Sequence, residues 1–105
     1  MPVRKAIVTA AIGLHARPAA EFVRAVNETG LPVTISKAGN DAVDARSLLE
    51  VMSADFNRGC EVELAVAEEA LPAGRTVTEA EDALGGLAEL LAAQAAQTPK
   101  APAAP

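Results

Sequence analysis

Aromatic side chains are almost absent from this sequence of 105 residues, which has two Phe and no Trp or Tyr. Half of the residues are nevertheless apolar, and 22% are charged. This balance supports a packed core and argues against global disorder. The chain is long enough for one domain, and the core of that domain must be mainly aliphatic.

Cysteine and histidine occur once each, as Cys60 and His15. A single cysteine excludes an internal disulfide and is typical of a reducing compartment. A structural zinc site needs four ligands, usually Cys and His, so these two residues cannot form one. The composition therefore argues against a structural zinc site.

Basic residues are outnumbered by acidic ones, nine to fourteen, which gives a net charge of −5. An acidic chain repels the phosphates of DNA and RNA, so nucleic-acid binding is disfavoured.

Long apolar runs are missing as well. Residues 84–96 include Glu89 and are too few to cross a bilayer, and the apolar residues 6–14 end at His15 without a clear signal-peptidase site. We expect a cytoplasmic monomer that does not insert into membranes.

The hydrophobic pattern predicts seven elements in the order β-α-β-β-α-β-α. Period-two alternation and β-branched residues predict four strands, at residues 3–9, 32–37, 42–45 and 60–66. Helical periodicity predicts three helices, at residues 16–29, at residues 47–56, and in a long final segment that begins after Thr76 or Thr78. Residues 68–75, with Pro72 and Gly74, are expected to form a loop.

Each predicted strand is expected to have one apolar face. This pattern favours a four-stranded antiparallel sheet covered by the three helices on one side, which is an α+β two-layer open-faced sandwich. The domain is expected to span residues 1–97. Residues 98–105 are rich in Pro and Ala and are expected to form a disordered tail.

Two helices have a clear apolar stripe. The first is formed by Ala19, Phe22, Val23 and Val26, and the last by Ala80, Ala83, Leu84, Leu87, Leu90 and Leu91. Gly30 is a suitable stop for the first helix. Ser47 and Glu50 have the spacing of a capping box at the start of the middle helix.

The segment Gly13-Leu14-His15-Ala16-Arg17-Pro18-Ala19-Ala20 places the sole histidine where a loop enters a helix. A helix start exposes unpaired N–H groups and the positive end of the helix dipole, which together attract anions. Arg17 adds a permanent cation with planar donors, and Pro18 stiffens the first turn. The pattern predicts a phosphohistidine site. A surface or capping histidine is the alternative that this pattern alone leaves open.

The same eight residues resemble the active-site signature of the HPr family, the histidine-containing phosphocarriers of the bacterial phosphoenolpyruvate-dependent sugar phosphotransferase system. The segment Arg46-Ser47-Leu48-Leu49-Glu50-Val51-Met52-Ser53 resembles the second signature of this family, which surrounds a regulatory serine. The separation of the two signatures and the order of the elements are also similar. The resemblance extends over residues 1–92.

The resemblance implies a phosphocarrier that forms a covalent phosphohistidine, and not an enzyme. His15 would accept a phosphoryl group on Nδ1 from phosphorylated Enzyme I and pass it to Enzyme IIA domains of sugar permeases. Arg17 would neutralise charge on the transferred group, while the backbone N–H groups of Ala16 and Arg17 would bind its oxygen atoms. Neither a metal nor a cofactor would be needed.

Ser47 has two interpretations, which do not exclude each other. From the residues alone, it is the N-cap of the middle helix, with its oxygen accepting the Glu50 amide. From the resemblance, it is the target of HPr kinase.

The middle helix is unusually apolar. Leu48, Leu49, Val51, Met52 and Phe56 cover an arc of roughly 160°, wider than the ~100° that one core-facing stripe needs. Either this helix is wedged between its neighbours, or Leu48, Leu49 and Met52 form an exposed docking patch. We favour the docking patch. The remaining functional alternative is a regulatory module that docks through this helix without relaying phosphate, but such a module would not need His15 or Arg17.

Overall fold

The computed structural model describes residues 2–37 and 39–95. Within them the elements are β1 (Val3–Ile7), α1 (Ala16–Thr29), β2 (Thr34–Lys37), β3 (Val43–Asp44), α2 (Leu48–Ser53), β4 (Glu61–Ala65), the 3-10 turn η1 (Glu68–Ala70) and α3 (Val77–Ala93). The predicted order of strands and α-helices is confirmed, whereas η1 lies in a segment predicted as loop. The predicted tail, residues 98–105, lies outside the described residues.

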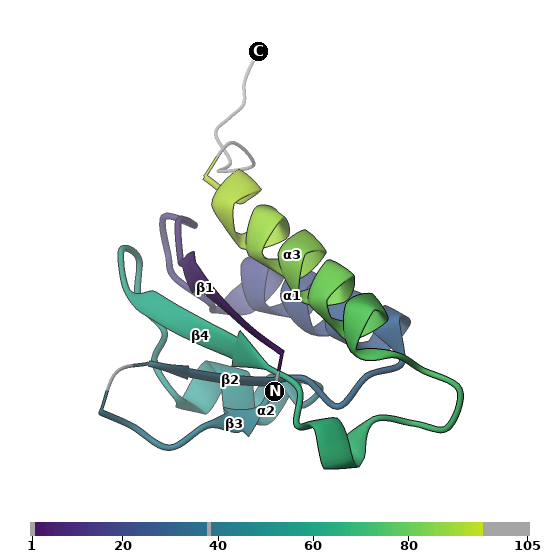
Figure 1. Ribbon diagram of the computed structural model, residues 1–105. Helices are drawn as coiled ribbons and strands as arrows, with labels where there is room; N and C mark the ends of the chain where they lie inside the picture. The colour runs from purple at the N-terminus through teal and green to yellow at the C-terminus, as the bar shows by residue number, and fades with distance from the viewer. Residues whose placement is uncertain (1, 38, 96–105) are drawn as a thin grey trace.

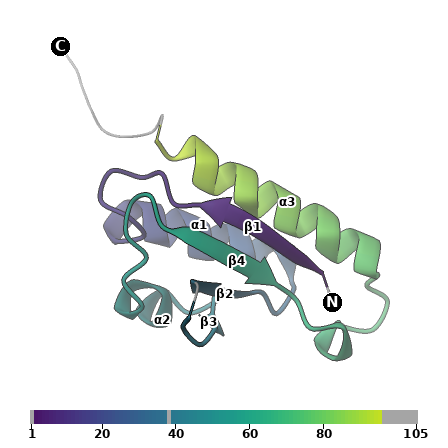
Figure 2. The ribbon, with the colours of Figure 1, turned by 60° about the vertical axis from the view of Figure 1, so that its left-hand side comes forward.

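The four strands form one antiparallel sheet in the order β1-β4-β2-β3. β4 lies in the middle, with Val3 of β1 and Thr34 of β2 both opposite Ala65. Figure 1 shows α3 along β1 and α1 farther from the viewer, behind the sheet, and Figure 2 shows the two helices after rotation. In both views no helix of the described chain covers the other face of β1, β4 and β2. The predicted α+β open-faced sandwich is therefore confirmed.

The core lies between the sheet and the helices. The four apolar positions predicted for α1 are all buried, as are Ala80, Leu84, Leu87 and Leu91 of α3. The expectation of one apolar face per strand is wrong for β1, because Val3 and Ile7 are exposed on the open face while Ala6 is buried. No helix among the described residues has the length and hydropathy needed to cross a membrane.

Several elements are shorter than predicted. β1 ends at Ile7, and Thr9 instead contacts the end of α3, where its hydroxyl donates to the Leu91 carbonyl and accepts the Ala95 N–H at 3.1 Å. α2 ends at Ser53 and not near Phe56, because Asp55 has a φ of +59°, which the interior of an α-helix does not allow. β2, β3 and β4 each begin one or two residues later than expected and the last two also end one residue earlier.

The helix termini follow the sequence closely. Thr76 and Glu79 form a reciprocal capping box at α3, and Gly30 ends α1 in the left-handed conformation with a φ of +71°. At α2 the prediction is half right. Ser47 Oγ accepts the Glu50 N–H at 3.2 Å, but the Glu50 carboxylate accepts the N–H of Asp44 at 3.0 Å, because the Ser47 N–H already donates to the Asp44 carbonyl.

Candidate functional site

His15 immediately precedes α1, as the sequence predicts. Its backbone is extended, with φ −132° and ψ 158°, and its side chain makes no capping hydrogen bond. The imidazole is 32% exposed. Its ring is therefore free of a capping role and accessible to a partner, which argues against the simple capping alternative.

The loop that carries His15 is fixed to the segment after α2. The Leu14 N–H donates to the Phe56 carbonyl at 2.8 Å, and the Leu14 side chain is fully buried. Gly13 has a φ of +73°, and a Cβ at this position would lie 2.6 Å from the Phe56 carbonyl oxygen. Only glycine fits there. The backbone before His15 therefore has little freedom to move.

The first turn of α1 contains the two backbone groups that were predicted to bind phosphoryl oxygens. The N–H groups of Ala16 and Arg17 belong to the first turn, where helix amides lack an intrahelical acceptor. Arg17 itself is exposed. Ala16 has a φ of +52°, an uncommon value for a residue with a side chain, and such strain often accompanies functional sites.

An acidic neighbour of His15 was not predicted. Asp55 Oδ1 lies 3.8 Å from His15 Nε2, and the Asp55 side chain is 74% exposed. This pair joins two segments forty residues apart, so it depends on how the loop after α2 packs. No local pattern signals this pair, because Asp55 falls inside the helix that the sequence predicts at residues 47–56.

Ser47 lies within a network of charged and polar groups. Arg46 donates two side-chain hydrogen bonds to the Asp44 carboxylate, from Nε at 2.9 Å and from Nη2 at 3.2 Å. These bonds hold the pKa of Asp44 below its ordinary value. The Asn27 side chain donates to the Arg46 carbonyl at 3.3 Å and so connects α1 to the start of α2. Ser47 is half-buried, and the carboxylate of Glu50 is tied nearby to the Asp44 amide.

The three residues predicted to form a docking patch differ in exposure. Leu49 is 76% exposed and Leu48 is 40% exposed, whereas Met52 is half-buried and packs against the core. Ile12, in the loop before His15, is also exposed. α1 and α2 are in contact, so the exposed leucines and the histidine belong to neighbouring elements.

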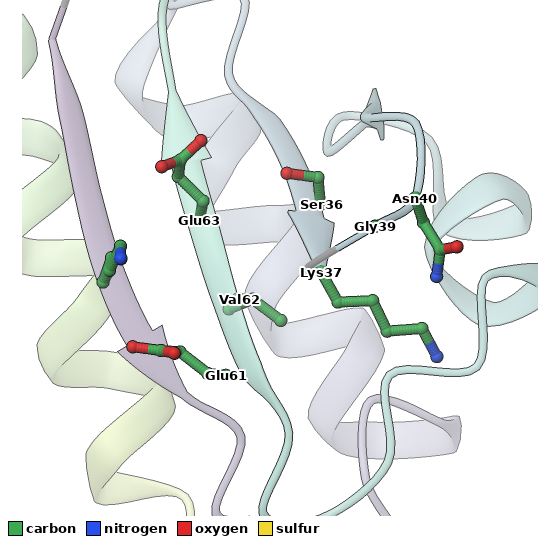
Figure 3. A pocket seen from close by; sticks show the side chains of 8 residues that line it. Ser36, Lys37, Gly39, Asn40, Glu61, Val62 and Glu63 are labelled. Carbon is green, nitrogen blue, oxygen red and sulfur yellow. The ribbon is translucent and has the colours of Figure 1, made fainter.

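A separate pocket of about 270 Å³ lies on the open face of the sheet. Figure 3 shows its lining side chains on β4, at the end of β2 and in the turn that follows β2. Lys5, Lys37, Glu61 and Glu63 give this pocket charges of both signs, and His15 is not among its residues. Nowhere in residues 2–37 and 39–95 do three or more His, Cys, Asp or Glu side chains gather as a metal site would require.

Comparison with known proteins identifies the relatives of this chain. A family model described as "PTS HPr component phosphorylation site" matches residues 3–93. The phosphocarrier protein HPr of Streptomyces coelicolor is 45% identical over 92 residues, which are 88% of this chain and 89% of the relative. The phosphocarrier protein HPr of Pseudomonas putida is 34% identical over 64 residues, which are 61% of this chain and 71% of the relative.

Solved structures show the same similarity. A crystal structure of HPr from Thermoanaerobacter tengcongensis has a TM-score of 0.73 and 26% identity, with 91% of this chain and 97% of the other covered. A phosphocarrier protein HPr from Bacillus anthracis has a TM-score of 0.64 and 29% identity, with 84% and 93% covered. The fold, and not only the two short signatures, is therefore shared.

Proposed function

Because this chain belongs to the HPr family and is a phosphocarrier of the phosphotransferase system, we propose that His15 is the residue that carries the phosphoryl group. The observation that supports this assignment is the placement of the sole histidine. Its ring is partly exposed at the start of α1, next in the chain to the first-turn amides, which lack an intrahelical acceptor, and to the exposed Arg17. Residues 1–97 form the phosphocarrier domain, and the family match at residues 3–93 falls within it.

The chemistry asks for positioning and charge neutralisation. Nδ1 of His15 attacks the phosphorus atom of the incoming group in line with the bond that breaks. The N–H groups of Ala16 and Arg17 bind the phosphoryl oxygens, and the Arg17 guanidinium balances their charge. The same arrangement serves the reverse step, so the group can leave to the next acceptor. The protein is a carrier in this relay and not a catalytic enzyme.

The partners are components of the phosphotransferase system. Enzyme I is the phosphoryl donor, and Enzyme IIA domains of sugar permeases are the acceptors. Docking involves the exposed Leu48 and Leu49, the half-buried Met52 of the same helix, and the exposed Ile12 in the loop before His15. In this proposal the protein acts as a monomer in the cytoplasm, and nucleic acid is not among its partners.

Ser47 stays a prediction as a regulatory site for HPr kinase. Its hydroxyl oxygen already serves as the N-cap of α2, and the carboxylates of Glu50 and Asp44 are part of the same network. A phosphate on Ser47 would gain from the helix dipole and lose from these like charges. The capping role therefore has direct structural support, and the regulatory role rests on the resemblance.

Mass spectrometry after incubation with Enzyme I and phosphoenolpyruvate tests the proposed site. The parent protein is expected to gain one acid-labile phosphate, and His15→Ala none. His15→Ala should stay folded, because the imidazole makes no capping hydrogen bond, and a thermal unfolding curve provides this control. A folded His15→Ala protein that still gains the phosphate would place the site elsewhere. A parent protein that binds Enzyme I but gains no phosphate would favour the docking module.

A further inference from the structure

The contact between His15 and Asp55 supports an inference that goes beyond the proposed function. This inference rests on the proposed function. Asp55 Oδ1 is 3.8 Å from His15 Nε2, the ring nitrogen opposite the one proposed to carry phosphate. This distance is longer than a hydrogen bond. The Asp55 side chain is 74% exposed, so it has room to rotate toward the ring, and such contacts often tighten only in the reacting complex.

The backbone holds Asp55 at this place through two connections. Its carbonyl oxygen accepts a hydrogen bond from Lys37 Nζ at 2.9 Å, which ties it to the end of β2. The next carbonyl, that of Phe56, accepts the N–H of Leu14 at 2.8 Å, one residue before His15. The acidic residue and the histidine are therefore parts of one fixed arrangement.

The conformation of Asp55 is also unusual. Its φ of +59° lies in the left-handed region, which most residues with a side chain avoid and which Asp and Asn tolerate best. Glycine would adopt this conformation without strain. The chain thus has a carboxylate at a position where the backbone alone would favour glycine, and that carboxylate faces the reactive ring.

We propose that Asp55 is a positioning residue that holds the proton of His15 on Nε2, so that Nδ1 presents its lone pair to the phosphoryl donor. A neutral imidazole has one N–H and one free nitrogen, and a carboxylate beside Nε2 favours the N–H there. In the transfer, the Nδ1–P bond forms while the bond between phosphorus and the donor atom breaks. The electron pair of that bond stays with the donor, and the Nε2 proton stays on His15 and faces Asp55.

Two substitutions separate this role from a structural one. Asp55→Gly removes the carboxylate and suits the left-handed backbone, so the protein should remain at least as stable as the parent. Asp55→Asn keeps an acceptor oxygen and removes the charge. Asp82→Asn, at an exposed position on α3, is the matched control for the loss of one negative charge. All variants are made in the full chain.

The first readout is the tautomer of His15 in the unphosphorylated protein, from the ¹⁵N shifts of the ring at a pH where it is neutral. We expect the Nε2–H form to dominate in the parent and in Asp82→Asn, and a mixture of both forms in Asp55→Gly. The second readout is phosphorylation by Enzyme I under single-turnover conditions. Asp55→Gly should be about two- to fivefold slower, the range expected for one exposed charged contact, and Asp55→Asn should fall between it and the parent.

The proposal is overturned if Asp55→Gly has the tautomer ratio of the parent, or if it is phosphorylated at the rate of the parent. A change confined to the KM for Enzyme I, with no change in the tautomer, would make Asp55 a docking residue and overturn it too. Failure of the proposed function is a different result, because the parent would then gain no phosphate on His15. The tautomer measurement does not depend on that outcome.

Discussion

The side-chain amide of Gln94 donates a hydrogen bond to the backbone carbonyl of Pro18 at 2.9 Å, and so joins the end of α3 to the first turn of α1. Gln94 is 2% exposed, and its Oε1 has no hydrogen-bond partner in the part of the chain that the structure describes. One polar side chain is therefore buried directly beneath the turn that carries Arg17. Thr9, which binds the carbonyls of Leu91 and Ala92, secures the same end of α3 to the loop after β1.

This relationship predicts a difference between two substitutions of Gln94. Gln94→Ala should lower the free energy of unfolding by about 1–3 kcal/mol, because it leaves a cavity and removes a hydrogen bond. Gln94→Leu keeps most of the volume and removes the unpartnered oxygen, so its cost should stay below about 1 kcal/mol. Urea unfolding measures both. Equal losses for both substitutions would show that the hydrogen bond, and not the packing, is decisive.

Removal of residues 98–105 should leave the protein unchanged. A chain truncated after residue 97 keeps Gln94 and Ala95, so it should match the parent in melting temperature and phosphotransfer.

Arg17 is expected to act on the transfer step more than on docking. Its charge is most valuable while charge redistributes on the phosphoryl group. Arg17→Ala should therefore lower the transfer rate by about 10- to 100-fold, with a much smaller change in the KM for Enzyme I. Arg17→Lys keeps the charge and loses the planar donors, so it should fall between. Rapid-quench kinetics separate the two constants. Equal losses in rate and binding would instead make Arg17 an interface residue.

A negative charge at Ser47 should affect stability and transfer in opposite directions. Ser47→Asp can still cap α2 and gains from the helix dipole, by ~0.3–1 kcal/mol at most, with Glu50 opposing it. The melting temperature of Ser47→Asp should therefore equal that of the parent or be slightly higher. Phosphorylation of His15 should slow, because the charge repels an acidic partner surface at the docking helix, and added salt should reduce this effect.

Ser47→Ala is the matched control for this charge. It should lose about 1 kcal/mol of stability with the cap and keep the transfer rate of the parent. Transfer rates and thermal melts are measured at several ionic strengths for all three proteins. If Ser47→Asp transfers as fast as the parent at low salt, α2 is not part of the docking surface and the role of Leu48 and Leu49 is wrong.

Two arginine–carboxylate pairs predict how stability falls in acid. Hydrogen bonds from Arg46 lower the pKa of Asp44. One hydrogen bond from Arg75, with a second from the backbone N–H of Thr76, lowers the pKa of Glu79. The folded state therefore binds these protons less readily than the unfolded state. The resulting stability is present above pH about 4–5 and is lost as the pH falls through the lowered pKa values.

Substitution of each arginine tests this pH dependence by urea unfolding between pH 7 and pH 2.5. The stability difference between Arg46→Ala and the parent should disappear in acid. Arg75→Ala should keep a residual difference, because Arg75 Nη1 also donates to the Thr29 carbonyl at 2.9 Å, a bond that does not titrate. A difference for Arg46→Ala that stays constant over this range would contradict the assignment.

The sequence predicted what depends on local pattern. The stripe of α1 followed from its spacing, and the Gly30 stop followed from residue type. Thr76 was one of the two caps predicted for α3. Each of these features is determined within one or two turns of chain. The position of His15, where a loop enters α1, was predicted for the same reason.

Features that depend on tertiary packing were not predicted. Asp55 approaches His15 only because the loop after α2 packs against Gly13 and Leu14. Gln94 gave no signal, since a glutamine at a helix end is ordinarily exposed. The Glu50 carboxylate binds Asp44 and not Ser47, because the Ser47 amide finds a backbone acceptor first. Each of these choices depends on residues that the local pattern cannot bring together.

The order of strands in the sheet has a consequence for how the chain folds. β1 is an edge strand whose sheet neighbour is β4, so Val3 cannot pair with Ala65 until β4 has been synthesised. Pairing of distant segments requires closure of a long loop and slows folding. During synthesis, β1 therefore has both edges open until β4 has left the ribosome. Open strand edges promote aggregation, so a ribosome stalled before β4 should release a chain that needs a chaperone.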